Sequence, residues 1–171
     1  MNFVNAIAEW ETFYLLTGTA AATLMGLLFV AVSIHVETFH RRTSGEMHLF
    51  AALTFNCFFY VLLISIIFLI PHISPLGLGL PLLLFGLLAV VNAFIQQSRA
   101  RKAHLGPGQA SITSRFNLPI ATLFLLVLSA IGILLKVSLG LYGLVAVIIL
   151  LLVSASLNAW SLLVLSEGET A

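Results

Sequence analysis

Aspartate is absent from this 171-residue chain, and its six acidic residues are all glutamates. Charged residues make up only 8% of the sequence, whereas a soluble domain carries about 25%. The net charge is +1, which gives no basic field for nucleic acid, so we predict no nucleic-acid partner. The single cysteine, Cys57, excludes a disulfide within the chain.

Groups that carry chemistry are also missing. The sequence has no Ser/His/Asp arrangement, CxxC pair, P-loop or nucleotide fingerprint, and its glutamates lie only in the two tails and the first connection. Three histidines in that connection, His35, His40 and His48, match no zinc spacing. We therefore predict a non-enzymatic protein without a cofactor or metal. Ion-coupled transport is disfavoured too, because the apolar runs contain no ionisable residue.

Apolar residues dominate what is present, at 61% of the chain. A helix needs about 20 apolar residues to cross a bilayer. Five runs reach this length without Asp, Glu, Lys, Arg or His, and they are continuous, unlike the alternating strands of a β-barrel. We predict an all-α, polytopic transmembrane helix bundle forming one domain over residues 1–171, with spans at about Thr12–Ile34, Leu49–Ile70, Leu76–Ile95, Phe116–Leu135 and Leu141–Leu165.

The connections between these runs differ in length. Residues 71–75 and 136–140 form short turns, whereas 35–48 and 96–115 are longer and carry most of the charge. Pro75 and Pro81 predict an irregular first turn in the third span. Asn117 followed by Pro119 is typical of a helix start, which places the beginning of the fourth span there.

Basic residues set the predicted orientation. Six of the seven lie in the first and third connections, and Lys136 alone lies on the opposite side. Because cytoplasmic loops are enriched in Lys and Arg, we predict a multi-pass inner-membrane protein with its N-terminus outside and its C-terminus in the cytoplasm. Trp10 and Tyr142 then fall at the outer interface and Trp160 toward the inner one.

A strip of small residues marks the first span. Gly18, Ala22 and Gly26 recur at every fourth position, flanked by threonines. Small residues let helices approach closely in lipid, so the strip predicts either packing within the chain or a subunit interface, with a pore lining as a third alternative. Gly140 and Gly143 offer a possible partner strip in the fifth span.

Polar side chains form a belt near the predicted cytoplasmic edge. An unpaired amide in hydrocarbon is costly, so these groups should bond to one another or to water. The belt predicts either hydrogen bonds between helices or a small polar cavity open to the cytoplasm. Its members are Asn56, Asn92, Thr122, Ser154, Asn158 and Ser161.

The third connection carries four clustered cations. Basic residues beside a bilayer attract anionic headgroups, at about 1 kcal/mol each. The alternative is that they only set the topology. The residues are Arg99, Arg101, Lys102 and Arg115.

The stretch from Trp10 to His35, which reads W-x-x-F-Y-x-x-x-G-x-A-A-A-x-x-x-G-L-L-F-V-A-V-S-I-H, resembles the first span of a family of small, uncharacterised bacterial inner-membrane proteins. The HRR triplet ending at Arg42 and the FLIP sequence ending at Pro71 are similar to that family as well. The resemblance covers about the first 70 residues. It implies a bacterial inner membrane and supplies no activity, cofactor or functional residue.

Three functions fit these observations. The first is a non-enzymatic membrane module that self-associates as a homo-oligomer, with an uncharged pore as one form of it. The second is an accessory or regulatory subunit of another membrane-protein complex. The third, which the absent chemistry disfavours, is a lipid-active enzyme or a small-solute carrier.

Overall fold

The chain folds into antiparallel helices, each of which runs along most of the length of the bundle. The structure, a computed structural model, describes residues 10–34, 45–71, 74–103 and 109–167. These residues form five α-helices with no strand among them, which confirms the predicted all-α bundle. The helices are α2 (Glu11–Ile34), α4 (Gly45–Phe68), α5 (Pro75–Ala103), α6 (Gln109–Leu134) and α7 (Leu139–Glu167).

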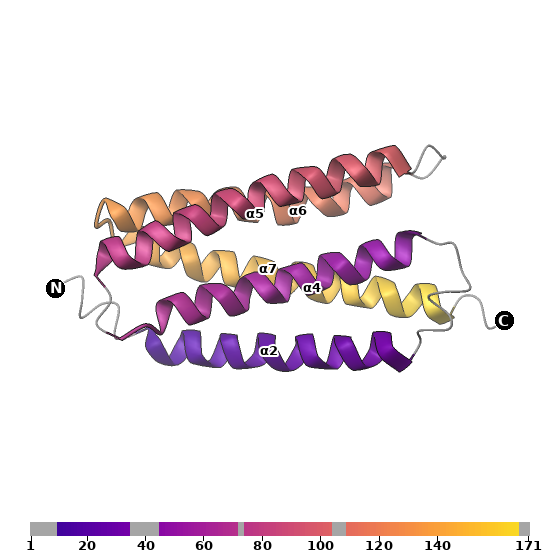
Figure 1. The fold of residues 1–171 in the computed structure, drawn as a ribbon, viewed down its shortest axis with the longest axis horizontal. Helices are drawn as coiled ribbons and strands as arrows, with labels where there is room; N and C mark the ends of the chain where they lie inside the picture. Colours follow the sequence, from indigo (N-terminus) through magenta and orange to yellow (C-terminus); the bar gives the residue numbers. More distant parts are fainter. Residues whose placement is uncertain (1–9, 35–44, 72–73, 104–108, 168–171) are drawn as a thin grey trace.

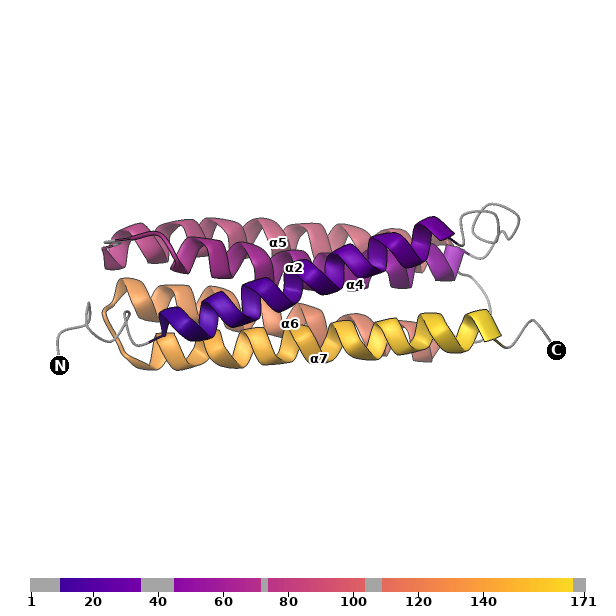
Figure 2. The same cartoon turned by 90° about the horizontal axis from the view of Figure 1, so that it is seen from below.

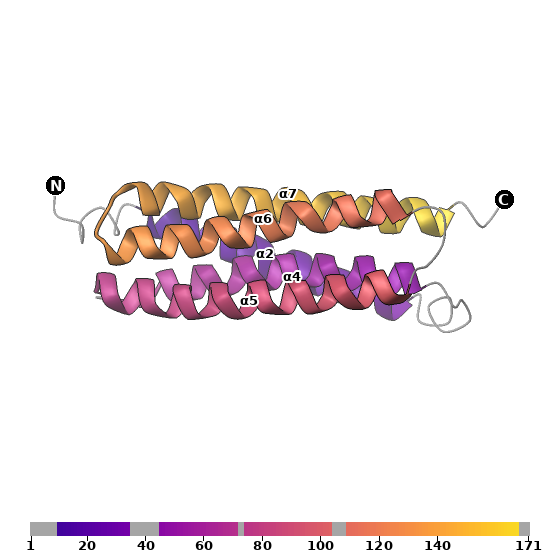
Figure 3. The ribbon, with the colours of Figure 1, turned by 90° about the horizontal axis from the view of Figure 1, so that it is seen from above.

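Four of the helices form a square, and the fifth lies outside it. α5 packs on α6, α6 on α7 and α7 on α4, while α4 and α5 touch much less. Figure 1 shows this arrangement from the side: α5 and α6 lie above α4 and α7, and α2 lies beneath them. Figure 3, which views the bundle from above, shows the α6–α7 pair beside the α4–α5 pair. α2 therefore adds one further layer to a four-helix bundle.

α2 crosses the bundle obliquely. In Figure 2 it begins beside α7 and ends over α4. Its contact with α7 includes an edge-to-face pair of the Trp10 and Tyr142 rings, whose centroids are 5.5 Å apart. The two aromatic residues that the sequence assigns to one interface thus lie at the same end of the bundle.

The short connections predicted after the second and fourth spans agree with the helix bounds, since α5 begins seven residues after α4 ends and α7 five residues after α6 ends. Ser74 caps α5: its hydroxyl accepts a hydrogen bond from the Gly77 amide at 3.0 Å. Pro75 then occupies the first helical position, where the missing N–H costs nothing. The predicted irregular first turn of the third span is therefore wrong, because this proline begins a capped helix.

The turn between α6 and α7 closes with a Schellman motif. The Val137 amide donates to the Gly132 carbonyl at 2.9 Å and the Lys136 amide to the Ile133 carbonyl at 2.9 Å. Lys136 takes the left-handed position of this motif, with φ of 57°, where glycine is usual. The turn therefore carries backbone strain at a lysine.

Two boundaries in the third connection were predicted wrongly. α5 continues to Ala103 and α6 begins at Gln109, so most of the expected 96–115 connection is helical. The residues after the apolar run include Gln, Arg, Lys and Ala, which are good helix formers, so the helix outlasts the apolar run. Pro119 accordingly lies inside α6, not at its start.

Prolines inside α5 and α6 are tolerated for a common reason. Pro81 cannot bond to the carbonyl four residues earlier, at Gly77, and Pro119 cannot bond to that of Arg115. Gly77 lies in the first turn of α5, and Arg115 precedes the apolar part of α6. Each freed carbonyl therefore lies near an end of a span, where water or headgroups can bond to it.

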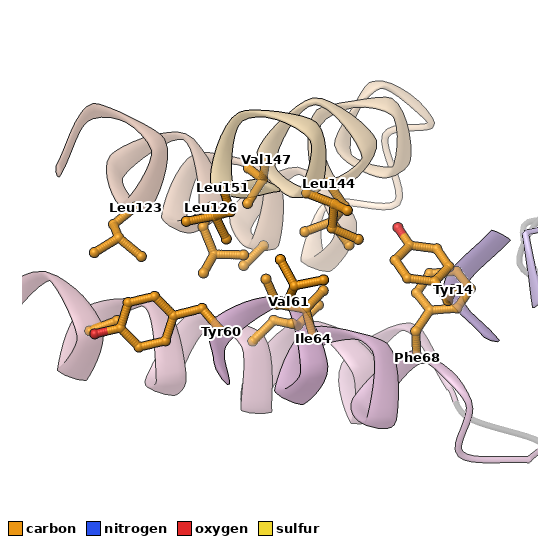
Figure 4. Close-up of a cluster of buried hydrophobic side chains, with 14 of the residues drawn as sticks. Tyr14, Tyr60, Val61, Ile64, Phe68, Leu123, Leu126, Leu144, Val147 and Leu151 are labelled. Carbon is orange, nitrogen blue, oxygen red and sulfur yellow. The ribbon is translucent and has the colours of Figure 1, made fainter. Parts of the chain in front are cut away.

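The core of the square is filled by branched aliphatic side chains. Figure 4 shows Val61 and Ile64 of α4 pointing toward Leu126, Leu144 and Val147 of α6 and α7. All five are fully buried. At one end the Tyr14 ring of α2 stacks on Phe68, with centroids 3.7 Å apart and an interplanar angle of 16°. The centre of one chain is thus a packed layer and not an open channel.

The outer surface is as apolar as the core. Large side chains such as Leu16, Phe29 and Leu128 are more than half exposed. Among the residues whose side chains the structure describes, α2, α4, α5 and α7 each carry a stretch long and apolar enough to cross a membrane. The described side chains of α6 also form an apolar stretch, Leu118–Leu134. The chain has the pattern of a multi-pass membrane protein, in which lipid covers the exposed leucines.

Candidate functional site

The small-residue strip of α2 does not follow a single neighbour. A Cβ built on Gly18 would lie 2.8 Å from the Ser65 Cβ of α4, so this glycine permits close packing within the chain. The Thr17 hydroxyl, beside it, lies 3.4 Å from the Ser65 hydroxyl. Ala22 is exposed, however, and nothing comes within 4 Å of a Cβ built on Gly26. Of the predicted strip, only Gly18 packs against another helix of the described chain.

Helix geometry explains this divergence. Residues that face α4 recur at spacings of three and four, at Tyr14, Thr17, Gly18 and Ala21. A strict four-residue step advances by about 40° around the helix, because each residue turns it by 100°. The strip of Gly18, Ala22 and Gly26 therefore rotates out of the α4 interface and onto the outer surface.

A second set of small residues does form one face there. Thr19, Ala22, Thr23 and Gly26 recur at i, i+3, i+4 and i+7, and all four are exposed; we call them the outer α2 face. The Thr19 hydroxyl donates to the Leu15 carbonyl at 2.8 Å, and the Thr23 hydroxyl donates to the Thr19 carbonyl at 2.9 Å. Both threonine donors are therefore satisfied by the helix itself.

Gly140 and Gly143 pack against α6 and not against α2. A Cβ on Gly140 would lie 2.8 Å from both the Ile133 nitrogen and the Ser129 carbonyl oxygen, and one on Gly143 would meet the Ser129 side chain. The proposed pairing of these glycines with the first span was therefore wrong. Tight turns bring consecutive helices together first, and α6 precedes α7 directly.

The polar belt divides into two groups. Between α4 and α5, the Asn56 side-chain amide donates to the Gln96 side-chain oxygen Oε1 at 3.3 Å, and the Asn92 side-chain amide donates to the Tyr60 hydroxyl at 3.4 Å. These two pairs form rungs one helical turn apart, which we call the α4–α5 ladder. Its asparagines are partly buried or exposed, so they act here as contacts between helices.

The second group lies between α4 and α7. The Cys57 thiol is 4.0 Å from the Ser154 hydroxyl, and both residues are buried. Thr54 and Asn158, one turn further toward the same end of the bundle, are buried as well. The Asn158 amide nitrogen has no hydrogen-bond partner in this structure. We call these four residues the α4–α7 cluster.

The remaining predicted site residues add less. Thr122 is buried, and its hydroxyl donates to the Leu118 carbonyl of its own helix at 2.8 Å. The side chains of five other predicted residues lie outside the part of the chain that the structure describes: Arg99, Arg101, Lys102, Arg115 and Ser161. Their lipid and polar-cavity roles stay predictions. Among the described residues, no three His, Cys, Asp or Glu side chains gather as metal ligands would.

Sequence reasoning missed several partners in these groups. Tyr60, Thr54 and Cys57 were not assigned to the belt. The one-turn spacing of Asn92 and Gln96 is visible in the sequence, and Tyr60 follows Asn56 by the same four residues. Two such pairs on consecutive antiparallel helices were the available signal for the α4–α5 ladder. The α4–α7 cluster had no comparable signal, because its helices are far apart in the sequence.

Comparison with known proteins adds no identification. No protein-family model matches the chain, and neither a curated protein nor a solved structure is similar to it.

Proposed function

We propose that this chain is a non-enzymatic integral membrane protein that self-associates through the outer α2 face. The supporting observation is the open space beside Gly26, together with the exposed stripe of Thr19, Ala22 and Thr23. Helices in a bilayer associate by close backbone contact and not by excluding water. A stripe of small residues makes such contact available to a helix from outside the chain.

The chemistry of this face suits a tight contact. Its threonine hydroxyls already bond to backbone carbonyls, so a second helix can cover them without leaving a donor unpaired. α2 is also the outermost helix of the bundle, and only 17% of its apolar stretch is buried against the rest of the chain. The same face on a second copy would give a symmetric dimer about a two-fold axis.

A pore would have to lie between copies. The square of α4, α5, α6 and α7 is filled by fully buried residues including Leu123, Leu126 and Leu151. We therefore place any uncharged pathway at an oligomer axis. An inner-membrane location, with the six clustered basic residues on the cytoplasmic side, completes the proposal.

Oligomeric state in lipid tests this proposal. Ala22→Leu would place a large side chain on the outer α2 face, and we expect it to lower the dimer fraction at least tenfold in single-molecule photobleaching or Förster transfer between labelled copies. Ala121→Leu is the control, because Ala121 is also exposed but lies on α6.

A wild-type chain that stays monomeric at every protein-to-lipid ratio would contradict self-association. Recovery of one stoichiometric membrane protein from native membranes by the wild type, but not by Ala22→Leu, would instead support the accessory-subunit alternative. Conductance in planar bilayers that requires the oligomer would support a pore between copies.

A further inference from the structure

The α4–α7 cluster contains a buried donor without an acceptor. Asn158 is only 2% exposed, and its amide nitrogen has no partner in this structure. The Tyr14 hydroxyl of α2 is the other buried side-chain group without a partner among the described residues. The Thr17 hydroxyl, by contrast, donates to the Phe13 carbonyl at 3.0 Å. Buried polar groups in native proteins are almost always hydrogen-bonded, to protein or to ordered water. The Asn158 amide therefore points to an acceptor that is not part of this chain.

Small polar residues occupy the turn of the α4–α7 interface next to Asn158. Ser154 precedes Asn158 by one helical turn, so the two side chains share a face of α7. Cys57 of α4 faces Ser154 across the interface, at 4.0 Å between sulfur and oxygen. Thiols are weak donors and acceptors, so this contact leaves most of the bonding capacity of the serine hydroxyl available.

Register brings Thr54 to the same level. α4 and α7 run in opposite directions, so moving back along α4 and forward along α7 leads toward the same end of the bundle. Thr54 is three residues before Cys57, and Asn158 is four residues after Ser154, which is about one helical turn in each case. Thr54 and Asn158 occupy that level, and both are buried. Four side chains from two helices, each with a hydrogen-bonding group, thus occupy two adjacent turns.

The cluster lies in the half of the α4–α7 interface that contains the start of α4 and the end of α7. Cys57 is eight residues from Leu49, where the charge-free run of α4 begins, and Ser154 is eleven residues from Leu165, where that of α7 ends. At 1.5 Å per residue these distances are roughly 12 and 17 Å. One turn deeper, the interface becomes apolar, with Val61 and Leu151 fully buried.

We propose that the Asn158 amide, with the Ser154 hydroxyl and the Cys57 thiol, binds a water molecule between α4 and α7. A buried water typically makes about three hydrogen bonds, and these groups supply one firm donor, a hydroxyl that can donate or accept, and a weak thiol. The apolar layer at Val61 and Leu151 ends the hydrated region, so water enters from one side of the bundle only. The site is independent of self-association through α2.

The single cysteine makes this proposal measurable without a label. The S–H stretching band in the infrared arises from Cys57 alone in the wild-type chain. After transfer of protein in lipid to heavy water, the rate at which S–H becomes S–D reports water at the cluster. The reference is a thiol in the apolar layer, introduced by Val61→Cys in a Cys57→Ala background. Val147→Cys supplies the same reference from α7 should the first variant fail to fold.

We expect the Cys57 thiol to exchange at least tenfold faster than the reference thiol. Asn158→Leu, which removes the amide donor, should slow Cys57 exchange at least tenfold, and the milder Ser154→Ala should slow it less. Equal exchange at positions 57 and 61 in the folded chain would overturn the proposal. A higher melting temperature for Asn158→Leu with unchanged Cys57 exchange would overturn it as well. Either outcome would mean that the α4–α7 interface is dry and that the Asn158 amide is unpaired.

Discussion

Gly132 of α6 and Gly140 of α7 bring their two backbones into direct contact: a Cβ built on Gly132 would lie 3.2 Å from the Gly140 Cα. Gly140 is the more closely packed of the two glycines, because a Cβ built on it would lie 2.8 Å from main-chain atoms of α6. Backbone atoms cannot rotate away as a side chain can. The separation of α6 and α7 is therefore set by the absence of a side chain at position 140.

Gly140→Ala should consequently destabilise the bundle. We expect a loss of about 1–3 kcal/mol, the usual cost of overpacking, because the helices must separate to admit the methyl group. The measurement is reversible unfolding in mixed micelles, followed by helical circular dichroism.

Gly26→Ala is the control, since nothing lies within 4 Å of its Cβ position. We expect this variant to be unchanged or slightly more stable in the monomeric state, because alanine favours helix over glycine. Equal losses at positions 140 and 26 would show that the glycine contact between α6 and α7 does not determine the packing.

Lys136 is a site where stability can be gained. Its φ of 57° is a conformation that glycine adopts freely and other residues adopt at a cost of about 1–2 kcal/mol. Lys136→Gly should therefore raise the free energy of unfolding by about 1 kcal/mol or less, since the added freedom of the unfolded glycine offsets part of the gain. Lys136→Ala removes the same charge without relieving the backbone, so it should give no such gain.

The Tyr14 hydroxyl provides a second test of stability. It is buried without a hydrogen-bond partner in this structure, while its ring stacks on Phe68. Tyr14→Phe keeps the stack and removes the unpaired hydroxyl, so we expect the chain to be equally stable or more stable by about 1 kcal/mol. Phe68→Ala removes the stack and should cost about 3–5 kcal/mol. A clear loss of stability in Tyr14→Phe would indicate that the hydroxyl has a partner outside the chain.

Orientation can be tested with a matched pair of serines. Ser138, in the turn between α6 and α7, and Ser98, near the C-terminal end of α5, are both exposed. That turn and the end of α5 lie at opposite ends of the bundle in Figure 1. In a Cys57→Ala background, we expect Ser138→Cys to react with a membrane-impermeant maleimide in intact cells and Ser98→Cys to react only after permeabilisation. The reverse pattern would invert the predicted orientation.

The sequence predicted the helices because the bilayer imposes a length on them. Five charge-free runs correspond to the five helices, and the short turns at Pro75 and Lys136 were placed correctly. Apolarity reports where lipid lies and not where a helix ends, so Gln96–Ala103 was assigned to a connection although its residues favour helix. Apolar composition could not show that α5 continues beyond the end of its apolar run.

Helix neighbours were harder to predict than helices. The small residues of α2 were recognised, but their four-residue spacing does not reveal that Gly18 faces α4 while Gly26 faces outward; that depends on the crossing of α2 over the bundle. The same holds for Cys57 and Ser154, which meet only because α7 returns beside α4. Lipid-exposed and buried faces are equally apolar here, so amphipathic patterning could not orient the helices.

The compact joint at Lys136 bears on how the protein is made. The Schellman turn is followed at once by the contact of Gly140 with α6. No polar loop therefore has to be translocated across the membrane between α6 and α7. The two helices are suited to leave the insertion machinery together as a hairpin, with the backbone polar groups of the turn already paired. Biogenesis of the last two spans would then be one event, completed after α4 and α5 are in place.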